Sequence, residues 1–148
     1  MGSSYTNLNL HIIFHTKSNN NCVMKEIDLP RIFRYIGGII KTLDGYPYMI
    51  GGIPDHIHIL TSIPPQFSVS DFVRSIKASS SKWIKSLDST YHFFAWQEGY
   101  GAFSVSKSNI NDVMDYISNQ KQHHRTYTTQ EEFKQFLLKH GILSQTES

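Results

Sequence analysis

The chain has 148 residues, of which 39% are hydrophobic and 13% aromatic, enough for one domain with a buried core. Its formal net charge of +2 permits nucleic-acid binding without arguing for it, since dedicated binders tend to be more basic. No stretch approaches the roughly 18 apolar residues of a membrane span, and the first residues lack the pattern of a signal peptide. Cys22 is the only cysteine, which excludes an intrachain disulfide and a cysteine zinc site. We therefore expect one cytoplasmic domain over residues 1–148, with a core of about 5–142, in which histidine and oxygen ligands hold any metal.

The first predicted element is a strand over residues 5–15, which are apolar and β-branched with a partial alternation. His11 and His15 lie four residues apart and so share one face of this strand. We expect them to be ordinary surface residues or the half-exposed edge of a pocket. A Ser-Asn-rich loop follows at 18–21.

A helix is predicted after Asp28, which can cap it, with Pro30 in the first turn and apolar residues at helical spacing as far as Leu43. Residues 46–50 are predicted to form a second strand. The glycine-containing segment 51–55 then turns the chain into a third strand, and the two strands form a hairpin.

The third strand carries the sequence Ile-Pro-Asp-His-Ile-His-Ile-Leu at residues 53–60. Because side chains alternate between the faces of a strand, His56 and His58 project to one side while Ile57 and Ile59 project to the other. The two imidazoles then lie about 7 Å apart or less. Such a pair can share a metal ion, although a strand with two incidental histidines would show the same pattern.

A second helix is predicted after Ser68, which forms an approximate capping box with Asp71. One face of this helix is basic, and it is either a solvated surface or a surface that tracks phosphates. Its residues are Arg74, Lys77, Lys82 and Lys85. The aromatic segment 91–105 follows, in which Trp96 and Tyr100 belong either to the core or to a surface that stacks on unpaired bases.

The third predicted helix is capped by Ser108-Asn109 and has an apolar stripe that includes Ile117. At about 100° per residue, Tyr116 points roughly 120° away from the centre of this stripe, so we do not expect it in the core. Gln120 lies one turn later, within about 40° of Tyr116 on the helical wheel, and the two share a polar face.

A last helix is predicted after a cap formed by Thr129 with Glu132 or by Thr128 with Glu131, and Gly141 ends it.

Taken together, these residues resemble the HUH endonucleases, and within them the single-tyrosine, insertion-sequence-200-like transposases. His56-Ile57-His58 is similar to the His-hydrophobe-His motif of that group, and residues 116–120, Tyr-Ile-Ser-Asn-Gln, resemble its nucleophile helix. The likeness extends over roughly residues 5–142, including the segments 96–105 and 119–124.

The resemblance implies an α/β (α+β) fold: a ferredoxin-like sandwich whose antiparallel sheet bears the histidines, with helices packed on one face and C-terminal helices carrying the nucleophilic tyrosine. It also implies a homodimer in which the Tyr116 helix of one subunit completes the histidine site of the other. The expected substrate is single-stranded DNA that folds into hairpins near element ends. Arg74, Lys77, Lys82, Lys85 and Arg125 are the candidates for phosphate contacts.

The implied reaction is attack by Tyr116 on a DNA phosphate, giving a 5′-phosphotyrosine and a free 3′-hydroxyl. A phenol with a pKa of about 10 is ionised in only about one molecule in a thousand at pH 7, so a metal is expected to assist. His56, His58 and Gln120 would hold Mg²⁺ or Mn²⁺, and Ni²⁺ or Zn²⁺ could substitute. Two alternatives stay open, a hairpin-binding module without activity and a nuclease in which bound water attacks.

Overall fold

The computed structural model describes residues 5–17, 22–120, 128, 131–132 and 134–135. The chain divides into two compact units, residues 1–118 and residues 119–148. The expectation of a single domain stays a prediction. Among the described residues, none belongs to a helix that is both long and apolar enough to cross a bilayer.

The first unit alternates strands and helices in the order strand, helix, strand, strand, helix, strand, helix. The elements are β1 (Asn9–His15), α1 (Leu29–Thr42), β2 (Pro47–Ile53), β3 (His56–Ser62), α2 (Val69–Leu87), β4 (Gly101–Ser104) and α3 (Ile110–Ser118). The strands form an antiparallel sheet in the order β2-β3-β1-β4. This order and connectivity are those of a ferredoxin-like fold, so the predicted fold class is confirmed.

The hairpin between β2 and β3 is tighter than the sequence predicted. Gly51 and Gly52, which we placed in the turn, pair with His58 and Ile57 and therefore extend β2 to Ile53. Gly52 has φ +152°, and a Cβ there would lie 2.3 Å from the carbonyl oxygen of His56. Glycine is required at this position because β2 and β3 approach each other so closely.

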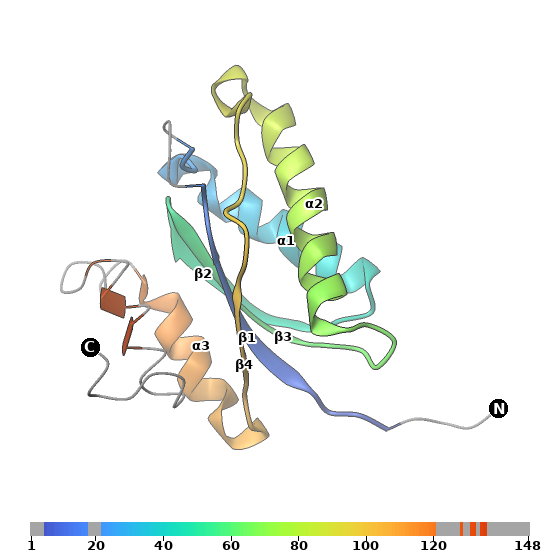
Figure 1. Ribbon diagram of the computed structural model, residues 1–148. Coiled ribbons are helices and arrows are strands. Elements are labelled where there is room, and N and C mark those ends of the chain that lie inside the picture. The colour runs from blue at the N-terminus through green and yellow to red at the C-terminus, as the bar shows by residue number, and fades with distance from the viewer. Residues whose placement is uncertain (1–4, 18–21, 121–127, 129–130, 133, 136–148) are drawn as a thin grey trace. The chain divides into compact units, whose positions relative to one another are not determined.

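The two faces of the sheet differ in chemistry. Ile12 and Phe14 of β1 and Ile57 and Ile59 of β3 are buried in the apolar core, together with residues of α1 and α2. The alternate positions of the same strands point the other way and carry histidines. Figure 1 shows α1 and α2 on one side of the sheet and α3 on the other.

Helix α3 reaches the histidine face through a close contact with β2. Gly51 pairs with His58 and so faces the same side, and a Cβ on Gly51 would lie 2.7 Å from the carbonyl oxygen of Ile117. Ile117 is buried, whereas Ile110, Val113 and Met114 of the same predicted stripe are only partly covered. The absence of a side chain at Gly51 therefore lets the backbone of α3 pack directly on the sheet.

Ser68 and Thr128 cap their helices as predicted, the predicted cap Ser108-Asn109 lies in a 3₁₀ turn directly before α3, and Asp28 occupies its predicted position without a capping bond. Ser68 Oγ accepts a hydrogen bond of 3.1 Å from the Asp71 N–H, and Thr128 Oγ1 does the same for Glu131 at 3.1 Å. Asp28 precedes α1 as predicted, but its side chain makes no capping bond. Its carboxylate instead accepts from the Tyr91 hydroxyl and from Arg31. Residues 131–132 and 134–135 of the predicted last helix are helical, and residues 133 and 136–141 lie outside the described residues.

Candidate active site on the histidine face of the sheet

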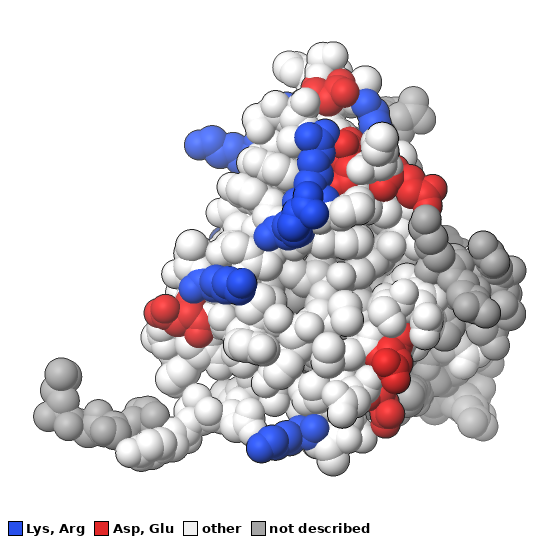
Figure 2. Space-filling model, turned by 180° about the vertical axis from the view of Figure 1, so that it is seen from behind, with Lys and Arg blue, Asp and Glu red and all other residues white. Residues whose placement is uncertain are grey.

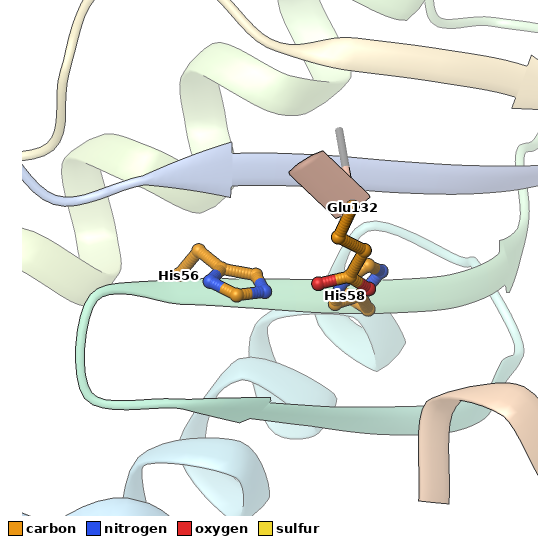
Figure 3. Close-up of side chains that lie close together, drawn as sticks. All are labelled: His56, His58 and Glu132. Carbon is orange, nitrogen blue, oxygen red and sulfur yellow. The ribbon is translucent and has the colours of Figure 1, made fainter. Parts of the chain in front are cut away.

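Two histidines of β3 lie side by side on one face, as the alternation predicted. The ring centroids of His56 and His58 are 5.0 Å apart, and both side chains are buried. Figure 3 shows both rings projecting from β3. Ile57, between them, lies in the core on the opposite face.

Each of these histidines has a hydrogen-bond partner at Nδ1. His56 Nδ1 lies 2.8 Å from Asp55 Oδ1, and His58 Nδ1 lies 2.9 Å from His11 Nε2. A carboxylate only accepts hydrogen bonds, so Nδ1 of His56 carries a proton, and in the neutral imidazole Nε2 then carries the lone pair. This arrangement fits a metal site, because metal-binding histidines commonly donate their other ring N–H to a carboxylate or a similar acceptor.

The two histidines of β1 line the same site. His11 is buried against His58, with 5.1 Å between ring centroids, and the ring of His15 lies 5.1 Å from that of His56. The expectation that His11 is an ordinary surface or edge residue is therefore wrong. Its shared face with His15 was visible in the sequence, but the pairing of β1 with β3 was not.

Tyr116 of α3 is half-buried and lies over the same face. Its ring centroid is 5.7 Å from that of His58 and 6.2 Å from that of His11, edge-on to both. The helical wheel predicted that Tyr116 points away from the apolar stripe of its helix, and the structure places it against imidazoles instead. The phenol of Tyr116 thus lies on the same face of the first unit as the two predicted metal ligands, His56 and His58.

The proposed third ligand belongs to the second unit. Gln120 follows the end of α3 and is buried. Its predicted role stays a prediction. Glu132, which lies on a helical turn that Thr128 precedes, is also buried, and sequence reasoning treated it only as a capping residue. Arg125 lies outside the described residues.

Four of the five basic residues predicted to contact phosphates occupy α2, in the helical layer across the sheet from the histidines. Lys82 and Lys85 are exposed, and Arg74 is also exposed but pairs with Asp71 at 2.9 Å. On the side of the molecule shown in Figure 2, basic side chains are separated by uncharged and acidic surface. The predicted DNA contacts of these residues remain untested.

Lys77 differs from its neighbours because its ammonium group is held by the chain itself. It donates to the carbonyl oxygens of Gln97 at 2.8 Å and Gly99 at 2.5 Å, and burial lowers the pKa of this lysine. These contacts tie α2 to the aromatic segment before β4. Trp96 in that segment is a core residue, since its indole N–H donates to the buried Ser80 hydroxyl at 3.0 Å.

The fold is similar to those of two solved transposase structures. One is described as a candidate transposase from Deinococcus radiodurans, with a TM-score of 0.59 and 22% identity over 81% of this chain and 96% of the other. The second is a REP-associated tyrosine transposase bound to a REP hairpin, with a TM-score of 0.57 and 13% identity over 84% and 74% of the two chains. At these identities the likeness shows the fold alone.

Similar sequences carry transposase names. The transposase for insertion sequence element IS200 of Salmonella typhimurium is 37% identical over 71 residues, 45% of this chain and 46% of the relative. The ISDra2 transposase TnpA of Deinococcus radiodurans is 27% identical over 73 residues, 46% and 52% of the two chains. This chain thus spans about half the length of these curated relatives. The family model described as "Transposase IS200 like" matches residues 4–120, and the protein therefore belongs to the IS200-like transposase family.

Proposed function

We propose that the protein is a metal-dependent DNA transposase that cleaves and rejoins single-stranded DNA through a covalent bond to Tyr116. The observation that carries this proposal is the position of the Tyr116 ring, 5.7 Å from the ring of His58 on the histidine face. A nucleophile and candidate metal ligands must reach the same phosphate, and this arrangement supplies both from one unit.

The proposed metal ligands are His56 and His58 with one oxygen ligand from the second unit. The carboxamide oxygen of Gln120 was predicted for that place, where it would be a neutral oxygen ligand. Two imidazoles and one oxygen suit Mg²⁺ or Mn²⁺ during turnover, and Ni²⁺ or Zn²⁺ could occupy the same ligands. The bound ion would withdraw charge from a nonbridging phosphate oxygen of the DNA.

In the proposed step, the Tyr116 oxygen forms a bond to phosphorus while the bond from phosphorus to the DNA 3′-oxygen breaks. The phenol loses its proton to solvent or a base, and the departing 3′-oxygen gains one to become a hydroxyl. The phosphate stays on Tyr116 as a 5′-phosphotyrosine. Attack by another 3′-hydroxyl reverses these changes and rejoins the strand, so no high-energy cofactor is consumed.

The proposed substrate is single-stranded DNA with a hairpin near the cleavage position. One of the structural neighbours is described as bound to a REP hairpin, and the family membership supports a similar substrate here. A homodimer and a cytoplasmic location, both expected from the sequence, stay predictions.

The proposal is tested by looking for DNA that is covalently bound to the protein. Wild-type protein is incubated with Mn²⁺ and a hairpin-containing single strand labelled at its 3′ end, and denaturing electrophoresis then separates free from protein-bound label. The label should migrate with the protein, whereas a 5′ label should leave on a shorter strand that ends in a 3′-hydroxyl. Tyr116→Phe should abolish the adduct and retain DNA binding. Tyr46→Phe, a change at an exposed tyrosine away from the histidines, is the matched control and should keep the adduct.

Other outcomes identify the alternatives. Cleavage that persists in Tyr116→Phe without an adduct would indicate a nuclease that uses bound water. Hairpin binding with neither cleavage nor adduct, over a range of hairpin sequences and metals, would indicate a binding module.

A further inference from the structure

The hydrogen bond between His11 and His58 joins two buried imidazoles from neighbouring strands. His11 Nε2 and His58 Nδ1 are 2.9 Å apart. In the pairing of β1 with β3, His11 is opposite Leu60, so it reaches His58 as a diagonal neighbour on the same face. This contact connects a residue outside the proposed ligand set to a residue within it.

A hydrogen bond between two neutral imidazoles contains one proton. Whether that proton is attached to His11 Nε2 or to His58 Nδ1 decides whether His58 can bind a metal through Nε2. If His11 Nε2 carries the proton, His58 has its own proton on Nε2, and that nitrogen cannot bind a metal. If His58 Nδ1 carries the proton and donates it to His11, the Nε2 atom of His58 presents a lone pair. Metal binding through Nε2 of His58 therefore requires the second arrangement.

We propose that His11 is a positioning residue for the metal site: it accepts the Nδ1 proton of His58 and so holds the ring in the tautomer and orientation that present Nε2. This inference rests on the proposed function, because it assumes that His58 is a metal ligand. It assigns a role to a residue that sequence reasoning placed on the surface or at a pocket edge.

The two ligands are supported differently. Asp55 precedes His56 in the chain, and its carboxylate can only accept, so the tautomer of His56 is set locally. His58 depends on a side chain from another strand whose own tautomer must match. His11 is suited to this because β1 is paired on both sides, with Leu60 of β3 and Phe103 of β4 opposite its position.

Zinc titration of the full chain without DNA tests this role, with calorimetry as the readout for wild type and three variants. His11→Phe keeps a ring of similar size but lacks the acceptor, and loss of such an outer partner typically lowers metal affinity about 10–100-fold. His11→Gln places an amide oxygen near the position of Nε2 and should recover most of that loss. His58→Ala identifies which part of the measured binding belongs to this site.

Unchanged zinc affinity in His11→Phe, combined with a loss in His58→Ala, would overturn this inference and leave the metal site intact. Equal losses in His11→Phe and His11→Gln would also overturn it, since His11 would then only fill space. Equal zinc binding by wild type and His58→Ala would overturn the metal site itself, and the inference with it.

A measurement on the wild type needs no substitution. Nitrogen-15 NMR of the zinc-loaded chain should show a scalar coupling across the hydrogen bond between His58 Nδ1 and His11 Nε2, with the proton attached to His58. A proton attached to His11 Nε2 in the zinc-loaded protein would overturn the inference.

Discussion

The backbone of Ile117 lies against Gly51, where a Cβ would come within 2.7 Å of the Ile117 carbonyl oxygen. Because Tyr116 is the residue before Ile117, this contact on β2 sets how deeply the tyrosine sits over the histidines. The position of the proposed nucleophile thus depends on a residue that has no side chain and no chemistry of its own.

Gly51→Ala should displace α3 from the sheet. The added methyl group meets backbone that cannot rotate away, and overpacking of this kind costs about 1–3 kcal/mol in the free energy of unfolding. We expect a lower melting temperature and a much slower formation of the covalent adduct in single-turnover assays.

Gly38→Ala is the matched control, since nothing lies within 4 Å of a Cβ there. The control should keep the adduct rate, and a helical alanine should gain up to about 1 kcal/mol of stability. An unchanged adduct rate in Gly51→Ala would contradict the dependence on this contact.

Mixing two inactive variants tests whether Tyr116 serves its own chain. Tyr116 and His58 of one chain lie in contact, so we expect a mixture of Tyr116→Phe and His58→Ala to form no covalent adduct. The measurement is the labelled-strand assay after co-refolding, which allows subunits to exchange. Appearance of an adduct in the mixture would show that Tyr116 reaches the histidines of a second subunit, as the resemblance implies.

The pair Asp28 and Tyr91 should make stability depend on pH at both extremes. The Tyr91 hydroxyl, with further help from the Arg31 guanidinium, holds the pKa of the buried Asp28 below its usual value. Because the pKa is lowered in the folded state, this stabilisation is present above the unfolded value of about 4 and is lost as pH falls through the folded pKa.

The same pair acts in the opposite sense in alkali. Burial and the hydrogen bond to Asp28 raise the pKa of Tyr91 to about 12. The resulting stabilisation is complete below the unfolded value of about 10 and disappears as pH rises through 12. Tyr91→Phe should lower the free energy of unfolding at pH 7 by about 1.5–3 kcal/mol and flatten both limbs. Urea unfolding of wild type and Tyr91→Phe over a range of pH measures this. If the two curves of unfolding free energy against pH differ only by a constant offset, the prediction is contradicted.

Lys82 and Lys85 of the predicted phosphate-binding set are exposed on α2. If each contacts a phosphate, its change to Gln should weaken DNA binding whatever the sequence and reduce the salt slope by about 1. Arg34→Gln removes the same charge from the exposed side of α1 and should leave the slope unchanged. Equal salt slopes for all three variants and the wild type would show that Lys82 and Lys85 of α2 do not contact DNA phosphates.

Local periodicity predicted the parts of the site that depend on one element. The alternation of His56, Ile57 and His58 gives the face of a strand, and the helical wheel gives the direction of Tyr116. Each of these follows from backbone geometry within a few residues.

The parts that sequence reasoning missed depend on which elements pair. The approach of His11 to His58 joins positions 47 residues apart, and it follows from the register of β1 against β3. The carboxylate of Asp28, predicted to cap α1, is used instead by Tyr91, 63 residues away. A local pattern gives the type of a side chain and its face, but it does not give the partner across the fold.

The alternation along β1 and β3 also links folding to chemistry. A slip of either strand by one residue would move its histidines into the layer under α1 and α2 and turn its core side chains outward, Ile12 and Phe14 from β1 or Ile57 and Ile59 from β3. Burying unpaired imidazoles among apolar side chains is unfavourable, so misregistered sheets are strongly disfavoured. Ile12, Phe14, Ile57 and Ile59 never meet DNA in the proposed reaction, yet their preference for the core selects the one pairing in which all four imidazoles of the site converge.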